Sequence, residues 1–242
     1  MKIRREYSHR LWACAVLLAQ DARDNTTAFA DGTPLRIMPL GASITWGYLS
    51  TDGNGYRKEV RDQLVAAGAT VNMVGSREHG NMTDNQVEGW PGYTIEMVHE
   101  KANIAVPKYL PNVVLLNVGT NDVSENVNLT GAGDRMTNLI NDIYHYSPSA
   151  TVILSTLVVR SNHTDEERVL DVNAQYRAVA TSLIAKKRRL VLVDMQPPAG
   201  PAVNQLVDGT HPNDAGYAKM GEVWFSGFQE ADKNGFLVAP EA

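Results

Sequence analysis

The chain has 242 residues, of which 43% are hydrophobic and 20% are charged, and its net charge at pH 7 is −5. This length fits one domain with a sizeable core, and the composition is typical of a folded globular protein. The net negative charge argues against a nucleic-acid partner, because phosphate binding depends on basic patches. No linker-like run or internal repeat divides the sequence, so we expect a single domain over residues 31–242.

The first 30 residues resemble a secretory signal peptide. Lys2, Arg4, Arg5 and Arg10 precede an apolar run at 11–19, and the small-x-small sequence "AFA" at 28–30 offers a cleavage site. The apolar run is too short to span a bilayer, so we expect secretion and no membrane partner. The only cysteine, Cys14, lies in this segment, which predicts a domain without disulfides. Sequons that would permit glycosylation begin at Asn25, Asn81, Asn128 and Asn162.

From residue 34 onward, short apolar runs rich in β-branched residues alternate with amphipathic segments. The runs are each too short for a helix and lie at 35–40, 71–74, 113–116, 152–154 and 190–193. Apolar residues at helical spacing predict helices around 136–144, 169–183 and 217–228. Strands that alternate with helices indicate βαβ units, so we predict an α/β fold: a parallel sheet in a three-layer α/β/α sandwich.

Four polar or glycine-rich segments follow the predicted strands. Ser43 follows the first strand, "EGWPGYT" at 88–94 lies after the second, "NVGTND" at 117–122 follows the third and "DGTHPNDAGY" at 208–217 follows the fifth. Ligands of open parallel sheets bind beyond the carboxyl ends of the strands. The segments are therefore expected to meet at one edge of the sheet and to form the functional site there.

Ser43, His211 and Asp208 are the residue types of a hydrolytic triad. A serine hydroxyl is a weak nucleophile until a general base removes its proton, and histidine is the usual base. Asp208, three residues before His211, can hold the imidazole in the required tautomer. The oxyanion formed during acyl transfer needs donors, for which the N–H groups of Ser43 and Gly92 and the side-chain amide of Asn121 are candidates.

These residues carry a resemblance to a known family. The segments "PLGASITWG", "EGWPG", "NVGTND" and "DGTHPNDAGY" resemble the four sequence blocks of the SGNH (GDSL-type) hydrolases, and most of all the fungal acetylxylan esterases of carbohydrate esterase family 3. The resemblance implies a flavodoxin-like, five-stranded parallel sheet of order 2-1-3-4-5. It also implies Ser43 as nucleophile, Asp208 and His211 as its triad partners, and Gly92 and Asn121 in the oxyanion hole. Ala42 stands where many members carry Asp.

We therefore expect a secreted serine esterase that removes short acyl groups, acetate above all, from xylan or a related plant-wall polysaccharide through an acyl-enzyme. No H-E-x-x-H motif, cysteine pair or phosphate-binding glycine loop is present, so neither a cofactor nor a metal is expected. The alternatives are a lipase, lysophospholipase or thioesterase of the same fold, and a non-catalytic carbohydrate-binding protein.

Several other side chains flank the predicted site. Trp46, Trp90 and Tyr93 are candidates to line a sugar or acyl pocket, although packing of loops onto the sheet explains each ring equally well. Asp122 is expected to bind backbone in its own loop. The five histidines other than His211 are expected to have no part in the chemistry.

Overall fold

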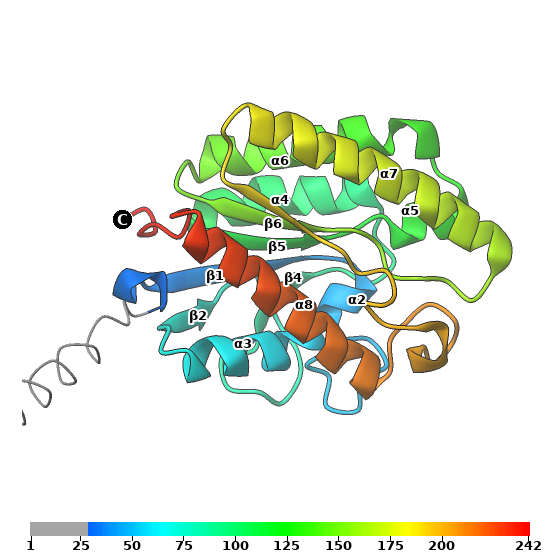
Figure 1. The fold of residues 1–242 in the computed structure, drawn as a ribbon, viewed down its shortest axis with the longest axis horizontal. Coiled ribbons are helices and arrows are strands. Elements are labelled where there is room, and N and C mark those ends of the chain that lie inside the picture. Colours follow the sequence, from blue (N-terminus) through cyan, green and yellow to red (C-terminus); the bar gives the residue numbers. More distant parts are fainter. Residues whose placement is uncertain (1–28) are drawn as a thin grey trace, which may run out of the picture.

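The computed structural model describes residues 29–242 (Figure 1). The predicted signal peptide lies outside the described residues except for its last two positions, and Cys14 and the sequon at Asn25 also lie outside them. The elements in chain order are η1 (Phe29–Gly32), β1 (Leu35–Gly41), α2 (Ser43–Trp46), α3 (Tyr56–Ala66), β2 (Val71–Met73), β3 (Arg77–Glu78), β4 (Gln86–Gly89), α4 (Ile95–Tyr109), β5 (Val113–Asn117), α5 (Thr120–Glu125), η2 (Leu129–Gly131), α6 (Ala132–Tyr146), β6 (Thr151–Ser155), α7 (His163–Ala185), β7 (Leu190–Val193), η3 (Val203–Gln205) and α8 (Asp214–Lys233).

The central sheet has the order β3-β4-β1-β5-β6-β7, and β2 also pairs with β1. On one side of β1, β2 pairs with residues 35–37 and β4 pairs with residues 40 and 41. On the other side, β1 runs parallel to β5, with Gly41 opposite Asn117. The five predicted strands therefore lie in the predicted order, and the loops after β1 and β5 leave the sheet side by side.

The sheet contains two strands that the sequence pattern did not predict. β3 is a two-residue strand, Arg77–Glu78, that runs antiparallel to β4. β4 carries the buried Glu88, so neither strand has the apolar periodicity by which strands are recognised. The expectation of five parallel strands is corrected to a seven-stranded, mainly parallel sheet. The correction matters because β4 leads directly into Trp90.

Helices cover both faces of the sheet, as Figure 1 shows. Successive strand residues point to opposite faces. In β1, Met38 and Leu40 pack in the core cluster that includes α4, α6 and α7, whereas Leu35 and Ile37 pack in the cluster that includes α3 and α8. The predicted three-layer sandwich is confirmed. Among the helices of residues 29–242, none combines the length and the apolar character needed to cross a membrane.

Candidate active site

Ser43 lies just beyond the carboxyl end of β1, at the first position of the one-turn helix α2. Gly41, at the end of β1, has no room for a side chain, since a Cβ there would collide with the carbonyl oxygen of Asn117 and with Oγ1 of Thr45. The strand can therefore pass close to β5 and turn at once into α2. The first N–H groups of a helix have no partner within it. That of Ser43 donates to no protein group in the described part of the chain.

Three side chains form a hydrogen-bonded line from Ser43 through His211 to Asp208. Oγ of Ser43 lies 2.8 Å from Nε2 of His211, and Nδ1 of His211 lies 2.8 Å from Oδ2 of Asp208. The other oxygen, Oδ1 of Asp208, accepts hydrogen bonds from the backbone N–H groups of Thr210 at 3.0 Å and His211 at 2.8 Å. Because Asp208 lies three residues before His211, one oxygen of its carboxylate binds the backbone of the turn and the other binds the ring of His211.

The charge on Asp208 determines which ring nitrogen carries the proton. Burial acts to raise the pKa of Asp208, but hydrogen bonds from the backbone and ring of His211 and from the backbone of Thr210 outweigh it and hold that pKa below its usual value. An ionised carboxylate only accepts hydrogen bonds, so Nδ1 of His211 is the donor. Nε2 is then left with a lone pair directed to the hydroxyl of Ser43.

A second histidine–carboxylate pair shows what distinguishes His211. Nε2 of His99 in α4 lies 2.8 Å from Oδ2 of Asp142 in α6. The exposed fractions of the two side chains, 14% and 43%, equal those of His211 and Asp208. The other ring nitrogen of His99 has no hydrogen-bond partner among the described residues. A histidine–carboxylate pair alone therefore does not identify the active site; the contact of Ser43 with the second ring nitrogen of His211 does.

A hydrogen bond joins α5, which carries Asn121, to the loop that carries Gly92. Nδ2 of Asn121, in α5, donates to the carbonyl oxygen of Tyr93 at 2.8 Å. Since an amide nitrogen carries two hydrogens, one remains for a ligand. Gly92 has a φ of +83°, which favours glycine, and a Cβ there would meet nothing within 4 Å. Within residues 29–242 the N–H of Gly92 donates to no protein acceptor.

Asp122 reaches beyond its own loop. Its carboxylate is fully buried and accepts hydrogen bonds from the backbone N–H of Ile95, at the start of α4, and from the guanidinium of Arg135. Burial raises the pKa of Asp122, against the lowering effect of both bonds. Asp122 therefore ties α5, which carries Asn121, to the start of α4, which follows the loop that carries Gly92. Local sequence reasoning did not foresee this role.

Trp46, Trp90 and Tyr93 belong to a layered aromatic cluster. The guanidinium carbon of Arg77 lies 4.0 Å from the ring centre of Trp46 and 4.6 Å from that of Trp90. His79 stacks on Trp46 at 4.0 Å. Two groups cannot share one face at that distance, so both faces of Trp46 are covered and only its edge is open to a sugar. Trp90 stacks with Tyr93 at 5.4 Å.

Two residues beside the site were not foreseen. The ring of Tyr48 stands edge-on to that of His211 at 4.8 Å, and Tyr48 is 47% exposed. The sequence does hold a signal for Tyr48. It follows Ser43 closely and comes directly after Gly47, whose φ of +88° marks a turn that keeps Tyr48 near the site. His79, one of the five histidines expected to have no part in the chemistry, packs on Trp46. No sequence signal locates His79, because the hairpin that positions it was not predicted.

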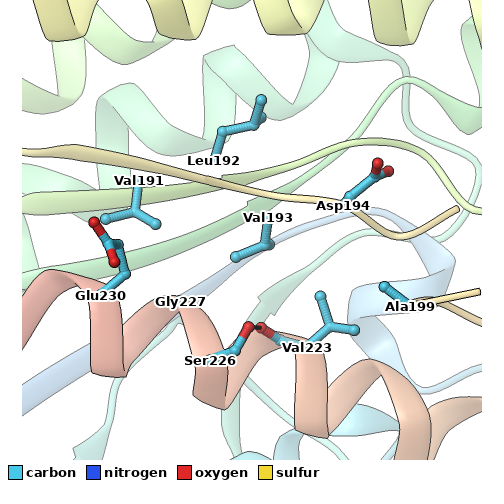
Figure 2. A pocket seen from close by; sticks show the side chains of 9 residues that line it. All are labelled: Val191, Leu192, Val193, Asp194, Ala199, Val223, Ser226, Gly227 and Glu230. Carbon is cyan, nitrogen blue, oxygen red and sulfur yellow. Dashed lines mark hydrogen bonds between the residues drawn. The ribbon is translucent and has the colours of Figure 1, made fainter.

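Two cavities lie away from Ser43. One, of about 320 Å³, lies between β7 and α8 (Figure 2), where Oγ of Ser226 donates to the carbonyl of Val223 and no histidine is among the lining residues. The other, of about 120 Å³, is lined by residues that include Asp52 and Asp214. In the described range, no group of three or more His, Cys, Asp or Glu side chains is arranged to hold a metal.

Comparisons with known proteins agree with the fold and with the four sequence blocks. A sequence model of the GDSL-like Lipase/Acylhydrolase family matches residues 40–219. A multidomain esterase from Ruminococcus flavefaciens is 31% identical over 81% of this chain, which spans only 28% of that relative. A family 3 carbohydrate esterase from Clostridium thermocellum superposes with a TM-score of 0.75 and 25% identity, covering 84% of this chain and 98% of the other. A family 3 carbohydrate esterase from Talaromyces cellulolyticus superposes with a TM-score of 0.72 and 23% identity, covering 83% of this chain and 99% of the other. The resemblance inferred from the sequence is confirmed.

Proposed function

Because the chain belongs to the GDSL-like lipase/acylhydrolase family and is by that membership a carboxylic ester hydrolase, we propose that it is a serine esterase that removes acetate from an acylated carbohydrate such as xylan. One observation carries the proposal: the hydroxyl of Ser43 lies on one ring nitrogen of His211, and the carboxylate of Asp208 lies on the other. This is the arrangement that general-base activation of a serine requires.

In the first half of the reaction, Oγ of Ser43 attacks the carbonyl carbon of the ester while Nε2 of His211 accepts the hydroxyl proton. The new carbon–oxygen bond moves the carbonyl electron pair onto its oxygen. The N–H groups of Ser43 and Gly92 and the second amide hydrogen of Asn121 would stabilise that oxyanion. The carboxylate of Asp208 stabilises the imidazolium that forms on His211.

In the second half, His211 returns its proton to the departing sugar oxygen as the ester bond breaks, which leaves the acyl group on Ser43. Water then attacks the acyl carbon, with Nε2 of His211 accepting its proton. Collapse of this second oxyanion breaks the bond to Ser43, and His211 gives the proton back to the serine oxygen. The products are the free sugar hydroxyl and acetic acid.

The test compares two histidine variants. His211→Gln should abolish hydrolysis of p-nitrophenyl acetate and release of acetate from acetylated xylan, whereas His99→Gln removes an equally exposed histidine that is also paired with an aspartate and should leave both activities near wild type. A phosphonate ester should label Ser43 once per chain, as mass spectrometry would show, and should fail to label Ser43→Ala. Retained activity in either Ser43→Ala or His211→Gln would overturn the proposal.

A lipase or lysophospholipase is the second candidate. The observation in its favour is exposed apolar surface near His211: Val207, whose N–H donates to the carbonyl of His211 at 2.8 Å, is 55% exposed, and Tyr48 stands beside the histidine ring. Fatty-acid release from a lysophospholipid, with none of the acetate release described above, would favour this second function.

We also propose that the protein is exported. The support is the order of basic residues, apolar run and "AFA" at 28–30, and the exposure of the sequon asparagines Asn128 and Asn162. Expression of the full chain in a eukaryotic host tests this. We expect the protein in the medium, with a new N-terminus near residue 31 and with sugar on the exposed sequons. Full-length, unprocessed protein retained in the cells would contradict the proposal.

A further inference from the structure

Two cationic side chains contact the ring of Trp90, close in sequence to Gly92. The guanidinium carbon of Arg77 and Nζ of Lys101 each lie 4.6 Å from the ring centre of Trp90. Neither cation is paired with a carboxylate in the described part of the chain, although six other ion pairs there join Lys or Arg to Asp. Nε1 of the same ring donates to Oε1 of the buried Glu88 at 2.8 Å, so two cations lie over the ring and one carboxylate lies at its edge.

The guanidinium of Arg77 is held in a fixed orientation with donors to spare. It lies against both Trp46 and Trp90, and Nη1 donates to the carbonyl oxygen of Gly89 at 2.7 Å. Nε and Nη2 of Arg77 have no protein partner among the described residues and are not buried. A guanidinium stacked on aromatic rings keeps its N–H groups in one plane, at the edge of the stack. Such a fork matches a carboxylate, which can accept two N–H groups at once.

The cationic pair lies close to the nucleophile. The backbone N–H of Trp90 donates to the carbonyl oxygen of Gly41 at 2.9 Å, two residues before Ser43. Trp46, which contacts Arg77, is the last residue of the helix that Ser43 begins. An anion bound by Arg77 and Lys101 would therefore belong to the same substrate molecule as the ester at Ser43.

We propose that Arg77 and Lys101 form a subsite for the carboxylate of a uronosyl residue near the acetylated sugar. The inference rests on the proposed function and narrows its substrate class: the chain acts on acetyl esters of an acidic polysaccharide in preference to a neutral one. A neutral sugar would offer these cations only uncharged hydroxyl acceptors, whose hydrogen bonds are weaker than those of a carboxylate.

A matched pair of polymers tests the subsite. One portion of a glucuronoxylan is carboxyl-reduced to the neutral polymer, and both portions are then acetylated to the same degree. The wild-type protein should release acetate from the acidic polymer with a kcat/KM about tenfold higher than from the neutral one, as one charge-assisted hydrogen bond predicts. The difference should lie mainly in KM and should shrink with added salt, which screens exposed charges.

Three variants complete the test. Arg77→Gln and Lys101→Gln should each lower the ratio of acidic to neutral kcat/KM toward one, and Lys101→Arg should restore it. Lys108→Gln is the matched control, because Lys108 lies on the same helix and also contacts an aromatic ring, that of Tyr109 at 4.9 Å, and should leave the ratio at the wild-type value. The ratio is the readout because a general loss of folding or catalysis cancels from it.

The outcomes separate this inference from the proposed function. Hydrolysis of p-nitrophenyl acetate together with equal wild-type rates on the two polymers would overturn the subsite and leave the esterase assignment intact. An equal loss of the ratio in Lys108→Gln and Lys101→Gln would also overturn it, since net charge and not a subsite would then be responsible. Absence of activity on every ester would overturn the proposed function itself.

Discussion

The side-chain amide of Asn121 is hydrogen-bonded to the carbonyl oxygen of Tyr93 at 2.8 Å, so α5 holds the loop in which Gly92 lies. We expect Asn121→Ala to lower kcat by roughly 10²–10³, the usual loss for one oxyanion-hole donor. KM should change little, because the amide would stabilise charge that exists only in the transition state. Steady-state kinetics on p-nitrophenyl acetate measure both constants. A change confined to KM would make Asn121 a binding or turn residue.

Asp208 should affect catalysis through the tautomer of His211. In Asp208→Asn, the amide can retain the backbone hydrogen bonds of the turn, but it no longer supplies a charged acceptor to Nδ1. We expect kcat to fall by about 10⁴, the loss known when a triad carboxylate becomes an amide. Asp142→Asn, in the equally exposed second pair, is the control and should retain activity. Comparable losses in both variants would indicate a structural effect.

Activity should decline on the acid side of neutrality. His211 can accept the proton of Ser43 only when its Nε2 is unprotonated, so protonation of the ring in acid removes the general base. Asp208, whose pKa is held below its usual value, is still ionised near neutral pH and does not start the decline. A pH profile of kcat/KM measures this. A rate that is flat from about pH 4 to about pH 8 would require a different base.

The same carboxylate gives a prediction for stability. Because the pKa of Asp208 is lower in the folded protein than in the unfolded chain, its contribution to the free energy of unfolding is present above the unfolded value of about 3.9 and is lost as pH falls through the folded value. The side chain is 43% exposed, so solvent screening keeps this contribution below about 1 kcal/mol. Urea unfolding of wild type and Asp208→Asn should therefore differ more at pH 7 than at pH 3. A larger difference at pH 3 would contradict the assignment.

Arg57 should be more important for stability than any exposed arginine. It is fully buried, and its guanidinium donates to the carbonyl oxygens of Trp46, Gly53, His79 and Asn85. Burial lowers the pKa of Arg57 to about 10, so it remains charged at neutral pH. Arg57→Met would leave these carbonyl groups without a donor and should cost about 3–5 kcal/mol in the free energy of unfolding.

The control for Arg57 is Arg177→Met, which removes an exposed partner of Asp194 and should cost less than about 1 kcal/mol. Urea midpoints measure both variants. Equal losses would mean that the four carbonyl groups find water or other donors once Arg57 is gone.

Acyl-chain preference separates the esterase from the lipase. We expect rates on p-nitrophenyl esters to fall steeply from acetyl to octanoyl, because added methylenes would meet protein and not gain the ~0.8 kcal/mol that burial of each would give. A kinetic series over the even-numbered chains measures this. Faster turnover of octanoyl than of acetyl esters would instead assign the exposed Tyr48 and Leu49 to an acyl-binding surface.

Sequence periodicity predicted the strands β1, β5, β6 and β7 and the helices α6, α7 and α8, because each buries one regular face. It also indicated the edge at which Ser43 and His211 meet, since parallel strands end together. The hairpin of β3 and β4 was missed, because Arg77 and Glu88 are polar in an otherwise apolar sheet. Contacts between residues distant in sequence stabilise that hairpin: the backbone N–H of Ser76 donates to the carboxylate of Glu88, and the guanidinium of Arg77 lies against Trp46. Local patterns carry no information about such contacts.

The turn that bears Asp208 and His211 is closed on itself by hydrogen bonds between the two residues and by the bridge between Leu206 and Pro212. Asp208 and His211 are therefore held in place relative to each other by one turn, whereas Ser43 lies at the end of a different element, β1. A chain that gains or loses residues between β7 and this turn changes a single catalytic distance, that from His211 to Ser43. Insertions or deletions in the segment between β7 and this turn would therefore leave the hydrogen bonds between Asp208 and His211 intact. Catalysis would then require only that the turn still places His211 beside Ser43.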